Sequence, residues 1–154
     1  MPALGDNPLF LGCADYRSTI ASNGESSGFT FPEEMRRHAD KGTALVTDKD
    51  PGDAEIAEVV SQAAAHSCIV LGTYNGHILQ GQLRLAKALA ATGLPMILVA
   101  LRNPYDLRNM PDHVAALAGW EYTRPLFDAL WPVLNGTVRP TGKLPLLTLT
   151  KAAK

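Results

Sequence analysis

The chain has 154 residues, of which 46% are hydrophobic, and its 14 basic and 15 acidic residues leave a formal net charge of -1. This length and composition are typical of one soluble globular domain, residues 1–154, with one hydrophobic core. The charges are balanced and do not cluster, which argues against a surface that binds nucleic acid or acidic lipid. Apolar runs stay well short of the roughly 20 residues that span a bilayer, and the start does not resemble a signal peptide. We therefore expect a cytoplasmic chain without a membrane or nucleic-acid partner.

The first half of the sequence alternates short apolar runs with helical patterns. The apolar runs at residues 8–14, 43–47 and 67–72 have the length of buried strands. Residues 18–31 are rich in Ser, Gly, Thr and Asn, so we expect a mobile surface loop there, followed by a helix of about ten residues that begins at Pro32. Asp53 is expected to cap the next helix. The predicted apolar stripe of that helix comprises Ile56, Val59, Val60, Ala63 and Ala64.

The second half continues this alternation. Residues 78–92 are expected to form a helix and residues 96–101 a central strand. Residues 114–120 fit either a helix or a buried strand, and the alternation of elements favours a strand. We expect a helix at residues 126–135 that Pro132 ends or kinks near Trp131, and a last strand at residues 144–149.

Strands that alternate with helices through short connections predict an α/β fold. The expected architecture is a three-layer sandwich, in which a mostly parallel sheet of five or six strands carries helices on both faces. Only a sheet covered on both faces hides consecutive apolar residues. The predicted core residues of the two central strands are Ile69, Val70, Leu71, Ile97, Leu98 and Val99.

Cys13 and Cys68 each lie in a predicted strand. Two cysteines in a chain of this length do not form a disulfide framework, so buried free thiols are expected. Sheet neighbours could still pair if they were oxidised.

Polar and aromatic residues follow several of the predicted strands, including Asp48 and Asp50 after the second. In a parallel sheet the carboxyl ends of the strands meet at one edge, where α/β proteins bind ligands. The alternative is that these loops are polar only because they are exposed to solvent. The candidate binding or interface residues are Tyr74, Asn75, His77, Arg102, Asn103, Tyr105 and Asp106.

The segment from Arg102 to Asp106 is expected to form an ordered loop. Arg102 can bind a carboxylate through two parallel hydrogen bonds and could pair with Asp106, while Asn103 and Asp106 can cap backbone groups. We expect Arg102 or Asp106 to be engaged within the domain and Tyr105 to lie toward a surface used by a partner.

The sequence offers no well-supported catalytic, metal or cofactor site. Residues 24–28 match the G-x-S-x-G pattern of a serine-hydrolase elbow, with Asp106 and His113 later in the required order, but a polar loop precedes Ser26 where an elbow needs a strand. The histidines lack the spacing and partners of a metal site. Neither a dinucleotide fingerprint nor a Walker sequence occurs. A serine esterase is therefore the weakest hypothesis.

Three motifs resemble one known family: the run VALRNPYD at residues 99–106, the helix end at residues 131–136, and PTGKLP at residues 140–145. Together they resemble the carboxy-terminal α/β sandwich domain of family 3 glycoside hydrolases, over residues 67–148 most clearly. The LRNPYD loop is similar to that of the β-N-acetylglucosaminidase (β-N-acetylhexosaminidase) branch.

The resemblance implies an accessory role. In this family a (β/α)8 barrel precedes the sandwich and carries the catalytic aspartate and, in this branch, a His-Asp acid/base pair. This chain has no barrel motifs, so by itself it is expected to be inactive. We expect it to act with a barrel in cis or in trans on N-acetylglucosamine-containing glycans, such as bacterial cell-wall fragments, with the glycan at the interface. The alternative is a stand-alone small-molecule or protein-binding module.

Overall fold

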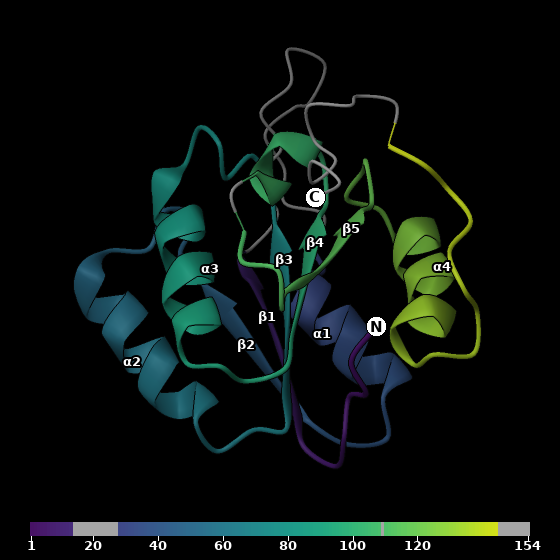
Figure 1. The fold of residues 1–154 in the computed structure, drawn as a ribbon, viewed down its shortest axis with the longest axis horizontal. Helices are drawn as coiled ribbons and strands as arrows, with labels where there is room; N and C mark the ends of the chain where they lie inside the picture. The colour runs from purple at the N-terminus through teal and green to yellow at the C-terminus, as the bar shows by residue number, and fades with distance from the viewer. Residues whose placement is uncertain (14–27, 109, 145–154) are drawn as a thin grey trace.

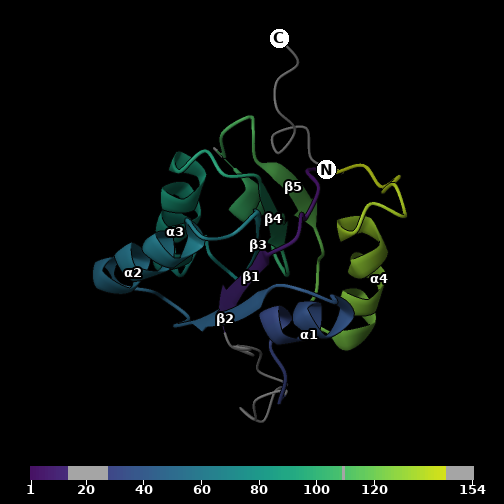
Figure 2. The same ribbon diagram turned by 90° about the horizontal axis from the view of Figure 1, so that it is seen from below.

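The computed structural model describes residues 1–13, 28–108 and 110–144. Within these residues, five strands form one sheet in the order β2-β1-β3-β4-β5, and every neighbouring pair is parallel. Helices α2 and α3 cover one face of the sheet, and α1 and α4 cover the other (Figures 1 and 2). The predicted three-layer α/β sandwich is confirmed. The chain steps outward from β1 to β2 and then returns to the other side of β1, so the strand order reverses between β1 and β3.

The elements follow the predicted alternation of strands and helices. The strands are β1 (Pro8–Cys13), β2 (Thr43–Thr47), β3 (Cys68–Thr73), β4 (Met96–Ala100) and β5 (Ala115–Ala118). The helices are α1 (Phe31–His38), α2 (Asp53–Ala63), α3 (Gln80–Ala91) and α4 (Arg124–Leu134), with a 3₁₀ helix, η1, at Pro104–Leu107. The strand predicted at residues 114–120 is therefore confirmed. All but the first residue of the strand predicted at 144–149 lies outside the described residues, as does most of the loop expected at 18–31.

The core lies on both sides of the three inner strands. Every residue of β1, β3 and β4 is buried, and the six predicted core residues are each at most 2% exposed. Because side chains alternate between the faces of a strand, Ile69, Leu71 and Leu98 pack beneath α2 and α3. Val70 and Ile97 pack with α1 and α4 on the opposite face. The uninterrupted apolar runs in the sequence thus arise from double coverage.

The aromatic residues after the undescribed segment 14–27 fix where α1 begins. Phe31, expected at the far end of a loop, is the first residue of α1 and fully buried against Phe127, with ring centroids 5.4 Å apart. Its backbone N–H donates a hydrogen bond to the Tyr122 hydroxyl (2.8 Å), which in turn donates to the Cys13 carbonyl (3.2 Å). Tyr122 therefore ties the end of β1 to the start of α1.

Helix α2 differs from the prediction at both ends. Gly52, not Asp53, is the N-cap residue, and it makes no side-chain capping bond. Asp53 is the first helical residue, and its almost fully exposed carboxylate lies 3.6 Å from the Arg84 guanidinium. The helix ends at Ala63, so Ala64 is exposed and does not extend the apolar stripe.

Helix α4 begins earlier than predicted and continues through Pro132. Thr123 caps it by accepting a hydrogen bond from the Leu126 N–H (3.3 Å), so the first turn starts at Arg124. Pro132 removes the bond that its N–H would make to the Asp128 carbonyl, but Asp128 lies on the exposed side of the helix, where water can replace the lost donor. The Asn135 N–H still donates to the Trp131 carbonyl (2.9 Å). Of the two expected effects of Pro132, an end to the helix near Trp131 is wrong, because α4 continues to Leu134.

Both cysteines are buried, as predicted. Cys68 lies opposite Pro8 in the β1–β3 ladder, five residues from Cys13. At roughly 3.3 Å per residue this separates them by about 16 Å along the strands, far beyond the reach of a disulfide. The alternative that they pair as sheet neighbours is therefore wrong.

Candidate functional site

The loops that follow β3 and β4 are joined by one buried carboxylate. Asp106 has no solvent exposure and accepts hydrogen bonds from the backbone N–H groups of Gly76 (2.9 Å) and His77 (2.7 Å). The His77 ring nitrogen Nδ1 lies 3.2 Å from the same carboxylate. Because β3 and β4 are parallel neighbours, their carboxyl ends bring these segments together beneath η1, near the top of Figure 1. The predicted residues Asn75, His77 and Asp106 therefore belong to one ordered structure.

Local sequence explains how this contact forms. Asn103 is extended, as expected before Pro104, and its side chain accepts a hydrogen bond from the Tyr105 N–H (3.3 Å), which starts η1. On the other loop, Asn75 has a left-handed backbone (φ 56), a conformation that Asn tolerates. A Cβ at Gly76 would lie 3.1 Å from the Asp106 Oδ2. Glycine at this position therefore allows the carboxylate to approach the backbone closely.

Arg102 binds the end of β3 rather than Asp106. Its Nη1 donates to the Tyr74 hydroxyl (2.7 Å), and its Cζ lies 5.5 Å from the centre of the Tyr74 ring. Tyr74 is itself buried against Tyr122, with ring centroids 5.5 Å apart. The alternative that Arg102 and Asp106 pair with each other is wrong, although both are engaged within the domain.

Gln82, which was not predicted, links a third loop to this edge. It is buried in α3, its Oε1 accepts from the Tyr74 N–H (2.8 Å), and its Nε2 donates to the carbonyls of Tyr74 (3.0 Å) and Lys49 (2.8 Å). Asp50 accepts from the Gly81 N–H (2.6 Å) in the first turn of the same helix. The loops after β2, β3 and β4 therefore form one hydrogen-bonded network. The sequence did contain one indication that Gln82 is buried: it lies in line with Leu85 and Leu89 on the apolar side of a predicted helix.

The outer surface of this edge carries Tyr105, as expected. Tyr105 is 40% exposed. The His77 ring packs against it at 61°, with centroids 6.0 Å apart, and the Arg108 Cζ lies 5.0 Å from its ring centre. Ile78, which follows His77 in the loop between β3 and α3, is 67% exposed. The edge thus presents an aromatic ring and an aliphatic side chain on a rigid base.

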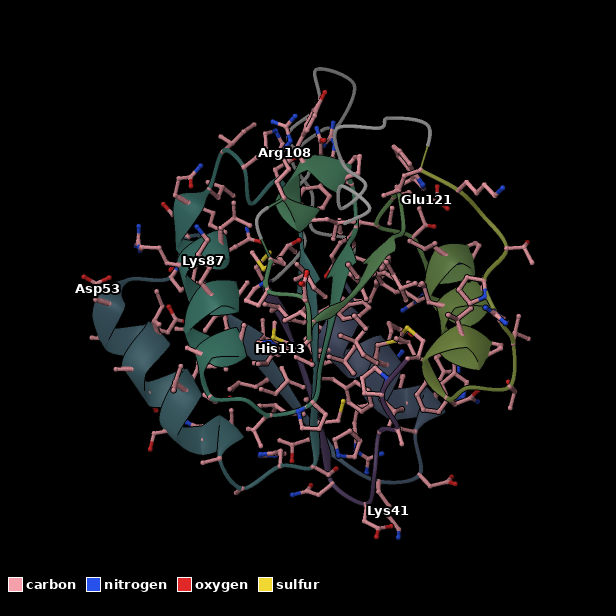
Figure 3. The ribbon with its side chains drawn as sticks, viewed as in Figure 1. Lys41, Asp53, Lys87, Arg108, His113 and Glu121 are labelled. Carbon is pink, nitrogen blue, oxygen red and sulfur yellow. The ribbon has the colours of Figure 1, made fainter. Side chains whose placement is uncertain are left out.

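The structure does not bring together the residues of the esterase hypothesis. Asp106 uses its carboxylate on the β3 loop, whereas His113 precedes β5 at the opposite end of the sheet, with its Nε2 3.0 Å from the Ala90 carbonyl. Figure 3 shows this separation, with Arg108 beside η1 near the top and His113 far below it. Ser26 lies outside the described residues.

The described residues contain neither a metal-binding cluster nor a membrane-spanning helix. In residues 1–13, 28–108 and 110–144, no three side chains of His, Cys, Asp or Glu are grouped so that they could hold a metal ion. Among the same residues, none of the helices has the length and apolar character needed to cross a bilayer.

Solved structures share this fold. A glycoside hydrolase family 3 β-N-acetylglucosaminidase from Paenibacillus sp. str. FPU-7 superposes with a TM-score of 0.76 over 94% of this chain and 28% of the other, at 24% sequence identity. The fungal multi-domain family 3 β-N-acetylglucosaminidase gives 0.71 over 94% of this chain and 16% of the other, at 19% identity. This chain has the fold of a family 3 glycoside hydrolase domain. A β-glucosidase from Listeria innocua gives 0.66 over 88% and 22% of the two chains, at 16% identity.

The likeness to family 3 glycoside hydrolases extends over only part of each enzyme. The chain spans between 16% and 28% of the length of these three enzymes. At such identities the likeness shows a shared fold, which confirms the fold expected from the LRNPYD and PTGKLP motifs. No protein-family model matches the sequence, and no curated protein matches it.

Proposed function

We propose that this chain is an accessory α/β sandwich domain of a family 3 glycoside hydrolase in the β-N-acetylglucosaminidase branch. The observation that carries the proposal is the match of 94% of this chain to part of the Paenibacillus β-N-acetylglucosaminidase, with a TM-score of 0.76. The β-glucosidase gives a lower TM-score of 0.66. The LRNPYD loop, which suggested the same branch, is the segment that binds the β3 loop through Arg102 and Asp106.

The chemistry of the reaction would come from a separate catalytic barrel, in cis or in trans. Glycoside hydrolysis needs two carboxyl groups, or an equivalent pair, at a fixed separation across the scissile bond. The Asp106 carboxylate at the candidate edge is fully buried and bonded to backbone N–H groups, so it cannot reach a substrate. Asp50 is bonded to the first turn of α3. These carboxylates serve the structure of the edge, and the substrate would be an N-acetylglucosamine-containing glycan such as a bacterial cell-wall fragment.

The barrel would dock on the edge of the sheet that is formed by the loops after β2, β3 and β4, the strand-end edge, with glycan at the interface. The network through Gln82, Asp50 and Asp106 fixes three loops before any partner binds, so little conformational entropy is lost on association. Tyr105 and Ile78 then provide exposed apolar surface on a rigid base, as interface anchors do.

Association with a barrel tests this proposal. The Paenibacillus enzyme without its matched region serves as the partner, and calorimetry measures its binding to the whole chain. We expect binding that Tyr105→Ala weakens and Lys41→Ala leaves unchanged, because Lys41 pairs with Asp6 at the opposite end of the sheet. Failure to bind the barrel, together with binding of N-acetylglucosamine by the chain alone, would favour the stand-alone binding module.

A further inference from the structure

An open depression of about 540 Å³ lies beside the strand-end edge, between α3 and η1. Its lining comprises His77, Gln80, Leu83, Lys87, Tyr105 and Arg108. We propose that this depression binds a small ring-shaped ligand that carries a carboxylate or a phosphate. The inference concerns a site on this chain alone and does not depend on the presence of a catalytic barrel.

The charge of the lining favours an anion. Lys87 and Arg108 face the depression from α3 and from the end of η1, and among the residues that the structure describes no acidic side chain contributes to the lining. Within the described residues, neither cation has an ion-pair partner, whereas the nearby Arg84 lies 3.6 Å from Asp53. Figure 3 shows Arg108 near the upper end of the molecule and Lys87 on α3 below it. The Asp106 carboxylate next to His77 is buried and already accepts hydrogen bonds from two backbone N–H groups. An anion in the depression would therefore meet attraction without a competing carboxylate.

His77 is held so that one ring nitrogen remains available. Asp106 fixes both the backbone N–H and the Nδ1 of this residue, and this geometry assigns the ring proton to Nδ1. The Nε2 has no hydrogen-bond partner among residues 1–13, 28–108 and 110–144. In the neutral ring Nε2 is an acceptor, so it can receive a hydrogen bond from a ligand hydroxyl. The depression thus combines an acceptor for a hydroxyl with two cations for an anion.

The remaining surface suits the body of a ring-shaped ligand. Leu83 and the half-exposed ring of Tyr105 supply apolar surface between the cations. The volume falls within the range of about 300–1,000 Å³ typical of small-molecule sites. A single anion would leave this apolar surface unused, whereas a sugar acid or a sugar phosphate would cover it.

Titration of the whole chain with four probes tests the site, with amide and His77 ring resonances followed by NMR. The probes are glucuronate, glucose 6-phosphate, glucose and inorganic phosphate. We expect at least one of the two charged sugars to shift the resonances of His77 and Arg108 and to bind more tightly than glucose or inorganic phosphate. Which charged sugar binds better identifies the anion as a carboxylate or a phosphate.

Variants that remove single charges distinguish binding at this site from nonspecific electrostatic attraction of the ligand to the protein. Lys87→Gln and Arg108→Gln should each weaken binding of the charged sugar by roughly threefold to fivefold, the effect expected for a half-exposed charge contact. Lys41→Gln removes a cation at the other end of the sheet and should change nothing. The proposal is overturned if glucose binds as well as both charged sugars, if inorganic phosphate binds as well as they do, if no probe shifts His77, or if Lys41→Gln weakens binding equally.

Discussion

Asp106 and His77 are bonded twice, once through the His77 backbone N–H (2.7 Å) and once through its ring (3.2 Å). The two residues lie in loops that follow neighbouring strands, and the carboxylate is completely buried while the imidazole is partly exposed. This contact positions the imidazole at the surface and holds the β3 loop against η1. The contact between the β3 loop and η1 therefore depends on one carboxylate.

Asp106→Ala should destabilise the domain strongly. The substitution leaves the buried backbone N–H of Gly76 and the partly buried N–H of His77 without a partner, which we expect to cost about 2–4 kcal/mol. For a domain of this size the melting temperature should fall by roughly 5–15 °C. Circular dichroism melts measure this change.

Two further variants serve as controls for Asp106. Asp106→Asn keeps an acceptor for one N–H and should lose less stability than Asp106→Ala. His77→Ala removes only the ring contact and should lose least, because the backbone bonds to Asp106 remain. Equal melting temperatures for the wild type and Asp106→Ala would show that the carboxylate does not hold the edge together.

Gly81→Ala should destabilise the contact between α3 and the β2–α2 loop. An added Cβ would lie 2.5 Å from the Pro51 carbonyl oxygen and 2.6 Å from the Asp50 Oδ1, so backbone would have to move. We expect a loss of about 1–3 kcal/mol in the free energy of unfolding, measured by urea denaturation. Gly142→Ala is the control, since Gly142 is exposed and a Cβ there meets nothing within 4 Å. Similar losses for both variants would contradict the close contact at Gly81.

Because of Cys68, the free energy of unfolding should decrease at alkaline pH. Burial raises the pKa of its thiol from 9.0 to about 11, against a smaller opposing effect of a backbone hydrogen bond at Ile69. The unfolded chain ionises this thiol first, so its contribution to stability is complete below about pH 9 and is lost as the pH rises toward 11. Between pH 8 and pH 11, the unfolding free energy should therefore fall more for the wild type than for Cys68→Ala. Parallel pH profiles would contradict the burial of this thiol.

The chain alone should have no hydrolase activity. The carboxylates of Asp48, Asp50 and Asp106 at the candidate edge each accept a hydrogen bond from a backbone N–H, and Asp106 and His113 lie at opposite ends of the sheet. A chromogenic N-acetylglucosaminide and a short-chain ester should both be hydrolysed at the background rate. Ester cleavage that disappears in Ser26→Ala would replace this account with the esterase hypothesis.

The sequence predicted the fold well because burial on both faces leaves a strong pattern. Apolar runs such as residues 96–100 can only be inner strands, and the alternation of elements identified the weaker edge strand at residues 115–118. Element ends were less predictable. The N-cap at Gly52 and the passage of α4 through Pro132 depend on solvent exposure at single turns, which the pattern does not contain.

The sequence predicted which residues lie at the candidate edge, but not which of their side chains bond to one another. The parallel direction of the strands follows from the alternating pattern, so Tyr74, His77 and Tyr105 could be assigned to one edge from the sequence. The choice of partners could not, because Arg102 binds Tyr74 and Asp106 binds His77 only once the two loops have adopted their three-dimensional positions. Gln82 was missed because a single buried polar residue in a helix has no local signature beyond its position on the apolar face.

Replacement of a family 3 sandwich domain by this chain tests the central claim most directly. In the Paenibacillus β-N-acetylglucosaminidase, this chain takes the place of the matched region, and hydrolysis of a chromogenic N-acetylglucosaminide is compared with that of the enzyme truncated at the same point. We predict that the chimera is more active than the truncated enzyme, and that Tyr105→Ala reverses much of the gain while Lys41→Ala does not. A folded chimera no more active than the truncated enzyme would contradict the proposal that this chain is an accessory domain of such a hydrolase.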